Sequence, residues 1–519
     1  MTATQLAPLP RLRVEPDAPR RIRAAHATTG RRIVVLDDDP TGSQTVHGIQ
    51  VVTSPDGDGI DAALAAPGSS CFVLTNTRSL PEAEAIEANA ALGRTVLELG
   101  RRLGAPVDII SRGDSTLRGH FIAEVRALDA ARRDVTGAGY DGVLLVPSYF
   151  EAGRFTAGDI HYARVGDHDV PVGETEFARD ATFGYSASDL REFVAEKSGG
   201  AISAGDVVSL GLEDIRLGGP ERVAEVLRGI SDGAFVVVNA TDYADLEVVA
   251  LGLLAVEAEG RAFLHRSGPS FVRALAGLDA QRPLSRAEIW PHGHPGGHGL
   301  VVVGSHVCLS SSQVAVARSR GGLEEVELDV ASVADPARRE DHVAEVAGRV
   351  VSALAGADVL LFTSRTLARA DDPEASLGVA RAVSAAVVDV VRAARAARPA
   401  WVVAKGGITS HDVAVRALGI RRAEVLGQLL PGMVSVFRPI DAPDEVVGVP
   451  YVVFAGNVGD ETTLAYVAGL FRKDAWCWRT DRRSCSMRGR RAAPCPRSPP
   501  TRSSRRERSA RRPNARACP

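Results

Sequence analysis

The chain has 519 residues, too many for one ordinary hydrophobic core, so two or three domains are expected. Hydrophobic residues make up 45% of it, charged residues 24%, and the formal net charge is -3, which is typical of a soluble globular protein and argues against a polyanionic partner. No run approaches the roughly 18 apolar residues of a membrane span, and we expect a cytoplasmic protein that binds neither nucleic acid nor membrane.

The two ends differ in composition from the rest. Residues 1–30 are rich in Pro, Arg and Ala without periodicity, which predicts a disordered N-terminal arm. Residues 473–519 predict a disordered basic tail, because from Ala475 onwards 14 Arg stand against Asp481 and Glu507. Such a tail can bind an acidic surface, but the abrupt change also resembles an out-of-frame extension of a GC-rich reading frame, the interpretation we favour. Four of the six Cys lie there without a CxxC pair, so neither a disulfide framework nor a zinc site is expected.

Short β-rich runs alternate with segments of helical period through most of the chain, which predicts α/β architecture with mainly parallel sheets. We expect a first domain over 31–282, a linker rich in Gly, Pro and His over 283–299, and a second domain over 300–472. The clearest expected strands are residues 33–37, 107–111, 142–148, 235–240, 300–305, 359–364, 401–407 and 451–457. The clearest expected helices are 81–103, 121–133 and segments starting near Ser312 and His411.

Three aspartates, Asp37, Asp38 and Asp39, stand at the carboxyl end of the first expected strand, in the motif LDDDPTGSQT. Ligands of open α/β sheets bind at these strand ends. Adjacent carboxylates repel one another, so a cation, a substrate hydroxyl or an arginine is needed to offset their charge. The alternative is a solvated acidic turn that caps a helix.

Two further expected strands end in polar loops of the same kind. The motif SRGDSTLRGH, 111–120, offers Arg112 and Arg118 as clamps for a carboxylate, and Asp114 and Ser115 as partners for hydroxyls. NTRSL, 76–80, brings Arg78 to the same edge of the sheet. Each loop alone is an ordinary turn with a helix cap, whereas their coincidence at strand ends predicts a site.

The expected second domain contains three glycine-rich or hydroxyl-rich turns between a strand and a helix, in VVVGSHVCLSSSQ, AKGGITS and FAGNVGDETT. Backbone N–H groups of such turns receive phosphate oxygens. Any one of them is compatible with an ordinary βα turn, but three in one domain indicate a nucleotide site. The chain has no GxxxxGK[ST] motif, so it is not a P-loop kinase. The GxGxxG at 137–142 precedes a strand instead of following one, the wrong context for a dinucleotide site.

Together these motifs resemble the four-carbon acid sugar kinases, over roughly residues 31–471. The resemblance is carried by DDxTG (Asp38, Asp39, Thr41, Gly42), by DSTLRG from Asp114 to Gly119, by the VVVGS strand and turn, and by AKGGITS. It implies a substrate-binding N-terminal domain, a nucleotide-binding C-terminal domain, an active site in the cleft between them, and ATP with Mg²⁺ as cofactors. A homo-oligomer is compatible with it.

The resemblance also assigns roles to residues. Substrate contacts are expected from Asp38, Arg78, Arg112, Gly113, Asp114 and Ser115. ATP contacts are expected from Ser267, Gly304, Ser305, His306, Val307, Gly406 and Gly407. The sequence leaves the catalytic base open between Asp38, Asp39 and Asp114, and it assigns no metal ligand.

The predicted function is ATP-dependent phosphorylation of a hydroxyl of threonate, erythronate or a 3-oxo-tetronate. Phosphoryl transfer needs alignment, charge compensation and a proton acceptor, which these residue types supply. The alternatives are a nucleotide-dependent oxidoreductase, a sugar-acid lyase, or a non-catalytic sugar-acid sensor.

Overall fold

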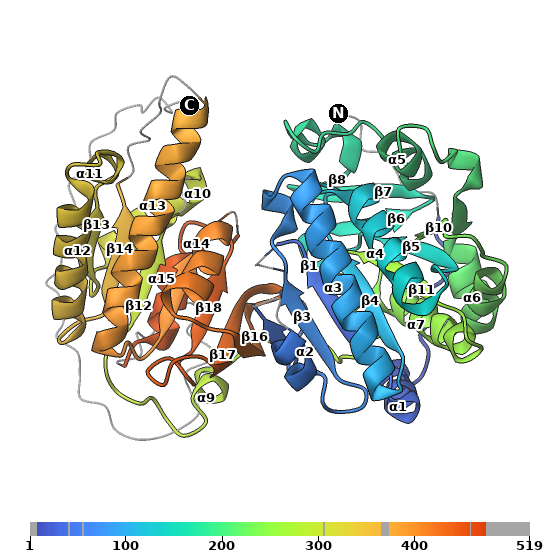
Figure 1. The fold of residues 1–519 in the computed structure, drawn as a ribbon, viewed down its shortest axis with the longest axis horizontal. Helices are drawn as coiled ribbons and strands as arrows, with labels where there is room; N and C mark the ends of the chain where they lie inside the picture. The colour runs from blue at the N-terminus through green and yellow to red at the C-terminus, as the bar shows by residue number, and fades with distance from the viewer. Residues whose placement is uncertain are drawn as a thin grey trace, which may run out of the picture. The chain divides into compact units, whose positions relative to one another are not determined.

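The computed structural model describes residues 8–39, 42–53, 57–304, 307–364, 373–456 and 458–473, and within these the side chains of 373–377 are left out. The predicted basic tail and two of the expected nucleotide contacts, Ser305 and His306, therefore lie outside the described residues. The described elements confirm an α/β fold built on mostly parallel strands (Figure 1).

The first half of the chain contains eight strands of the main sheet, all parallel to their neighbours within this half. They are β1 (Arg32–Asp37), β2 (Gln50–Val52), β3 (Ser70–Leu74), β4 (Val107–Arg112), β5 (Gly142–Val146), β9 (Val208–Leu210), β10 (Ala234–Val238) and β11 (Phe263–Ser267). Their spatial order is β2-β3-β1-β4-β11-β5-β10-β9. β3 lies on one side of β1 and β4 on the other, so the strand order reverses at β1. The carboxyl end of β1 is therefore a topological switch point.

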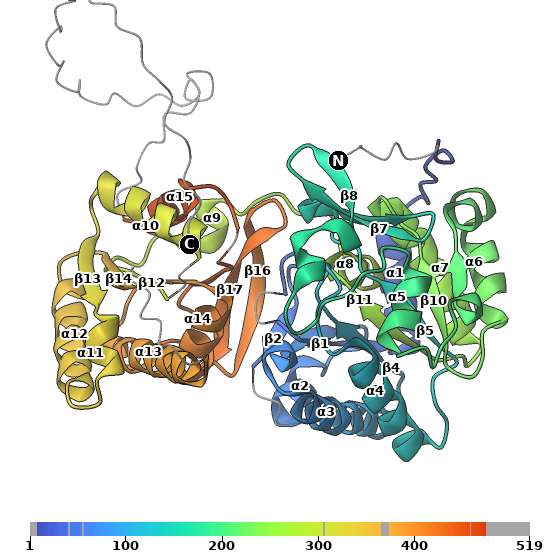
Figure 2. The ribbon, with the colours of Figure 1, turned by 90° about the horizontal axis from the view of Figure 1, so that it is seen from above.

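Helices cover both faces of these strands. They are α1 (Ala18–Thr29), α2 (Gly57–Ala63), α3 (Glu82–Leu103), α4 (Phe121–Thr136), α5 (Leu190–Lys197), α6 (Gly219–Arg228), α7 (Tyr243–Ala258) and α8 (Pro269–Leu275). Val34 and Leu36 of β1 share a core with α2 to α5, whereas Ile33 and Val35 share a core with α1 and α6 to α8. Figure 2 shows α2, α3 and α4 along one side of this half. Burial on both faces explains why β1 reads as a continuous apolar run.

The second half repeats this arrangement and adds an antiparallel hairpin. Its strands are β12 (Leu300–Val303), β13 (Glu324–Leu328), β14 (Val359–Thr363), β15 (Val402–Lys405), β16 (Arg422–Leu430), β17 (Met433–Asp441) and β18 (Tyr451–Phe454). Their order is β13-β14-β12-β15-β18-β17-β16, with β12 at a second switch point between β14 and β15. The hairpin of β16 and β17 is antiparallel.

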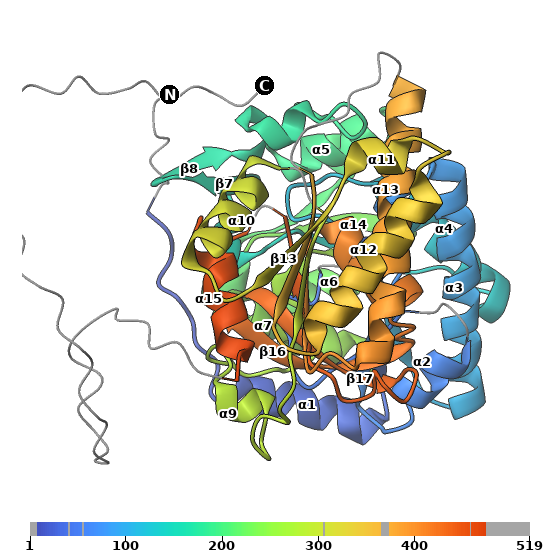
Figure 3. The same ribbon diagram turned by 90° about the vertical axis from the view of Figure 1, so that its left-hand side faces the viewer.

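The helices of the second half are α9 (Arg286–Ile289), α10 (Cys308–Arg320), α11 (Val330–Ala334), α12 (Arg339–Leu354), α13 (Pro373–Ala394), α14 (Gly407–Asp412) and α15 (Thr463–Phe471). Figure 3 shows α10 and α15 on one side of the strands and α12 and α13 on the other. Two cores match this division, one containing Val302 with α11 to α13 and one containing Val303 with α9, α10 and α15.

The two halves share one sheet, because β16 pairs with β2 in antiparallel register, Arg422 opposite Val52 and Glu424 opposite Gln50. A separate antiparallel sheet lies in the first half, with strands β6 (Arg154–Ala157), β7 (Ile160–Val165) and β8 (His168–Pro171). Short 3-10 helices include η1 (Thr77–Ser79) and η2 (Phe150–Ala152).

The prediction of a disordered arm over 1–30 is wrong for its second half, since residues 18–29 form α1. Ile22 of this helix is completely buried, and the ring Nε2 of His26 lies 2.7 Å from the carbonyl oxygen of Leu275. The helix is buried at few positions, so the apolar pattern in the sequence is too weak to show that it docks. The expected linker 283–299 also contains structure, because α9 lies in it and Trp290 is buried.

Candidate active site

The carboxyl ends of β3, β1, β4 and β11 lie side by side at one edge of the main sheet, because these strands are adjacent and parallel. Acidic and basic side chains from these ends, and Glu124 from α4, form what we call the strand-end cluster: Asp37, Asp38, Asp39, Arg78, Arg112, Asp114, Glu124 and Arg266. Seven of the predicted site residues, Asp38, Asp39, Arg78, Arg112, Gly113, Asp114 and Ser115, thus lie in or next to this cluster.

Arg78 joins two of the three aspartates. It donates to both carboxylate oxygens of Asp38, from Nη2 at 2.5 Å and from Nε at 3.2 Å, and from Nη1 to Asp39 at 2.9 Å. The Asp38 side chain is only 3% exposed, whereas that of Asp39 is 28% exposed. Burial opposes the charge of Arg78, yet Asp38 and the neighbouring carboxylates hold its pKa well above the usual range. Of these two aspartates, Asp39 is therefore the more exposed to solvent.

Arg112 pairs with the innermost aspartate. Its Nη1 lies 2.9 Å from Oδ1 of Asp37 and 4.0 Å from Oδ1 of Asp38. Burial raises the pKa of Asp37 to about 7, with Arg112 opposing this shift and Asp38 adding to it. Arg78 and Arg112, both expected to contact the substrate, are thus already paired with carboxylates of the protein.

Asp114 lies in the turn after β4 and is held by three donors. It accepts from the backbone N–H of Thr116 at 3.2 Å, from the Thr116 hydroxyl at 2.5 Å and from Nε of Arg118 at 2.6 Å. Burial works against ionisation, but Arg78 and Arg118 outweigh it and lower the pKa of Asp114. A carboxylate that is so strongly stabilised in its charged form is a poor proton acceptor.

Arg266 and Glu124 are cluster members that the sequence did not single out. Arg266 Nη1 lies 2.5 Å from Glu124 Oε2 and 2.8 Å from the Ser111 hydroxyl, and its Nη2 lies 4.0 Å from Asp38. Glu124 also accepts from the Thr77 hydroxyl at 2.6 Å. Arg266 lies in β11, a strand that was not among those expected from the sequence, and a buried arginine needs a partner.

Gly113 and Ser267 sit against Arg266. A Cβ atom on Gly113 would come within 2.5 Å of Arg266 Nη2, so a larger residue at this position would have to displace the Arg266 guanidinium. The Gly113 N–H donates to the carbonyl of Ser267 at 3.0 Å, and the Ser267 hydroxyl is buried without a hydrogen-bond partner among the described residues. Ser267, expected to contact ATP, therefore lies at the end of β11 beside the predicted substrate residues.

Four of the expected nucleotide residues lie at the second switch point. Gly304 follows β12, Gly406 and Gly407 follow β15, and Val307 precedes α10 with its side chain exposed. Gly406 has φ 114° and ψ 139°, a conformation that favours glycine, and its N–H donates to the carbonyl of Phe454 at 2.8 Å. The structure therefore brings the turns after β12, β15 and β18 to one edge, as parallel strands require.

Lys405 fixes the turn after β18. Its buried ammonium group donates to the carbonyls of Ala455 at 2.9 Å and Gly456 at 3.2 Å, and lies 3.8 Å from the centroid of the Phe454 ring. Burial lowers the pKa of Lys405 to about 7. The Ser310 hydroxyl adds a third donor to this turn, at 3.0 Å from the Gly456 oxygen.

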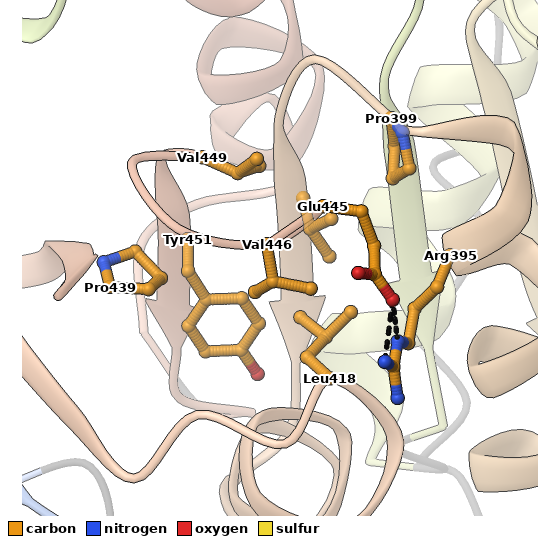
Figure 4. Close-up of a pocket in the computed structure, with 9 residues that line it drawn as sticks. Arg395, Pro399, Leu418, Pro439, Glu445, Val446, Val449 and Tyr451 are labelled. Atoms are coloured by element: carbon orange, nitrogen blue, oxygen red, sulfur yellow. Dashed lines mark hydrogen bonds and ion pairs between the residues drawn. The ribbon is translucent and has the colours of Figure 1, made fainter. Parts of the chain in front are cut away.

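An apolar pocket lies at the other edge of these strands (Figure 4). Val402 and Tyr451, which begin β15 and β18, line it together with Leu418 and Val446. Its charged wall is an ion pair, with Arg395 Nη2 2.5 Å from Glu445 Oε1. Since this pocket offers few donors to a phosphate and lies at the amino ends of the strands, we do not assign the nucleotide to it.

Among the described residues, no group of three or more His, Cys, Asp or Glu side chains is arranged to hold a metal ion. In the same part of the chain no helix combines the length and the apolar character that a bilayer crossing demands.

Two family models match the chain. The sugar-binding N-terminal domain matches residues 33–275, and the nucleotide-binding C-terminal domain matches residues 300–464. Together they span both switch points.

A curated relative, D-erythronate kinase of Heliobacterium modesticaldum, is 26% identical over 291 residues, which are 56% of this chain and 59% of the relative. The match thus spans less than two thirds of that relative's length.

Solved structures share the fold. A DUF1537 protein of Haemophilus influenzae has a TM-score of 0.57 at 17% identity, with 85% of this chain and 100% of that chain covered. A Salmonella typhimurium LT2 protein, named provisionally as a tRNA synthase, has a TM-score of 0.61 at 17% identity, with 84% and 98% covered. At this identity the likeness shows the fold alone. Since the two domain models match in order and account for most of the folded chain, the chain belongs to the four-carbon acid sugar kinase family.

Proposed function

We propose that the protein transfers the γ-phosphoryl group of ATP to a hydroxyl of a four-carbon sugar acid, of the threonate, erythronate or 3-oxo-tetronate type. The observation that carries the proposal is the strand-end cluster, in which paired arginines and carboxylates from four adjacent strands meet at a switch point. The relative named D-erythronate kinase makes erythronate the first substrate to test.

Asp39 is our choice for the catalytic base. Of the three candidates, Asp38 is almost completely buried under Arg78, and Asp114 is held in its ionised form by Arg118 and Thr116. Asp39 keeps a partly exposed carboxylate, with 28% of its side chain accessible, and accepts a hydrogen bond from Nη1 of Arg78 at 2.9 Å. It would accept the hydroxyl proton as that oxygen takes up the phosphoryl group and ADP departs.

The turns around Gly304, Gly406 and Gly456 are our candidates for holding the nucleotide phosphates through backbone N–H groups. Mg²⁺, which offsets phosphate charge when bound, commonly takes its ligands from phosphates and one or two carboxylates.

The test is a coupled ADP-release assay with D-erythronate, D-threonate, L-threonate and a 3-oxo-tetronate, each with ATP and Mg²⁺. We expect ADP release that depends on one of these acids, with one phosphorylated acid formed per ADP. Binding of an acid without ADP release would instead identify a sensor. Binding of NADH but not ATP would identify an oxidoreductase.

A further inference from the structure

The strand-end cluster leaves few cations available for a substrate carboxylate. Arg78 and Arg112 are paired with the three aspartates, as described above. Arg266 is paired with Glu124, and Arg118 with Asp114. An acid substrate nevertheless needs a cation, because an anion transferred into a site next to several carboxylates is repelled unless a positive charge faces it.

Arg154 differs from these four arginines. It begins β6 and forms no ion pair with any residue in the described ranges, and its Nε is buried without a hydrogen-bond partner there. Burial lowers the pKa of Arg154, with Asp114 as the largest opposing influence. The guanidinium of Arg154 is therefore desolvated without an ion pair to any carboxylate of the described chain.

The guanidinium of Arg154 is held in place by its surroundings. Two backbone hydrogen bonds of 2.9 Å tie Arg154 to Tyr149, which lies just beyond the carboxyl end of β5. The guanidinium carbon lies 5.8 Å from the centroid of the Tyr149 ring and 5.6 Å from that of Phe177. Aromatic contacts of this kind orient a guanidinium while leaving its hydrogen-bond donors available.

Arg154 also borders the strand-end cluster. The Phe177 ring that it contacts is shared with Arg118, whose guanidinium carbon lies 5.5 Å from the same centroid and whose Nε binds Asp114. The charge of Arg112 also acts to lower the pKa of Tyr149. The charge of Asp114 acts to raise the pKa of Arg154. The unpaired cation thus lies on the β5 side of the cluster, next to the turn that follows β4.

We propose that Arg154 binds the carboxylate of the sugar-acid substrate and thereby selects acids over neutral polyols. A guanidinium presents two parallel N–H donors that match the two oxygens of a carboxylate. The inference rests on the proposed function and assigns the anion contact to a residue outside the pairs formed by Arg78 and Arg112. In this arrangement those two arginines position the aspartates, and Arg154 recognises the charge of the substrate.

The test compares Arg154→Gln with wild type in steady-state kinetics for D-erythronate and ATP. We expect the KM for the acid to rise about 10- to 100-fold, the range given by loss of a charged hydrogen bond, with the KM for ATP and kcat within about threefold. Arg154→Lys keeps the charge but loses the paired donors, so it should lie between the two. A residue with a merely structural role would not affect the KM for one substrate alone.

The matched control is Arg164→Gln, which removes a guanidinium from β7 of the same small sheet, where Arg164 is exposed and paired with Asp169. It should leave both KM values unchanged. A KM for the acid within twofold of wild type in Arg154→Gln would overturn the inference. If Arg154→Gln does not fold, the same criterion applies to Arg154→Lys, and a KM for the acid within twofold of wild type in that variant would overturn the inference.

A failure of the role of Arg154 can be distinguished from a failure of the proposed kinase function. If the wild-type protein releases no ADP with any acid, the kinase assignment fails. Calorimetric titration with D-erythronate alone then tests Arg154, with binding by wild type and Arg164→Gln but at least tenfold weaker binding by Arg154→Gln as the expected result. Equal affinities of all three proteins would refute the role of Arg154.

Discussion

Arg112 and Asp37 form an ion pair with 2.9 Å between Nη1 and Oδ1, and their side chains are 6% and 0% exposed. The pair is incomplete, because Oδ2 of Asp37 and Nε of Arg112 are buried without hydrogen-bond partners among the described residues. Two adjacent carboxylates, Asp38 and Asp39, add further negative charge. Removal of the arginine alone should therefore be much more harmful than removal of both charges.

Arg112→Met should lower the free energy of unfolding by about 3 kcal/mol or more, since it leaves a buried carboxylate without its cation. The double variant Asp37→Asn/Arg112→Met should recover at least half of this loss. Denaturant unfolding at pH 8, where Asp37 is largely ionised, measures both. Arg94→Met, which breaks an exposed pair with Asp134, is the control and should change stability by less than about 1 kcal/mol. Equal losses in the single and double variants would contradict this account.

Asp39→Asn should reduce kcat about 100-fold or more with little change in the KM for ATP, because general base catalysis typically contributes at least this factor. The measurement is ADP release at saturating acid and ATP. Asp61→Asn, on α2 and paired with Arg102 at the surface, is the matched control and should retain wild-type kcat. A reduction of less than about threefold in Asp39→Asn would remove this residue from the role of base.

Gly406→Ala should raise the KM for ATP about tenfold and leave the KM for the acid unchanged. The reason is that φ 114° at this position is strained for any residue with a Cβ atom, so the turn between β15 and α14 must shift. Gly356→Ala serves as control, because Gly356 has no positive φ and open space around its Cβ position. An unchanged KM for ATP would show that the turn does not contact the nucleotide.

Lys405 should make stability depend on pH in the alkaline range. Burial lowers its pKa from 10.5 to about 7 in the folded protein, so between these values the unfolded chain carries a proton that the folded chain lacks. The free energy of unfolding should therefore rise with pH across this interval, by up to about 1.4 kcal/mol per pH unit. Lys405→Met should lack this contribution, which denaturant unfolding at pH 7 and pH 9 would detect as a smaller rise than in wild type. Parallel changes in the two proteins would refute it.

Much of the fold was predictable because parallel strands buried on both faces read as uninterrupted apolar runs. The expected strand at 33–37 is β1, that at 107–111 is β4, and that at 451–457 begins with β18. The hairpin of β16 and β17 was missed, since Gly427 and Pro439 interrupt its alternation. The docking of α1 was missed because its buried side chains are few.

It was also predictable that the candidate site residues lie close together, but not which of them form ion pairs. Each of these strand ends could be recognised in the sequence as a polar motif that follows an apolar run. This placed Asp38, Arg78 and Arg112 at one edge of the sheet. Which arginine binds which carboxylate depends on distances between chain segments about 40 to 75 residues apart, and no local pattern encodes these. Arg154, which forms no ion pair among the described residues, begins the short strand β6, in a segment for which the sequence offered no motif.

The junction between β2 and β16 consists of three residue pairs, the entire length of β2. So short a ladder has few hydrogen bonds to lose, while one hydrophobic core continues across it and contains both Val51 of β2 and Ala423 of β16. Native-state amide exchange at Val51 and Ala423 should accordingly be faster than at Val35 or Val403, which would reveal a partial opening in which each half keeps its own protected amides.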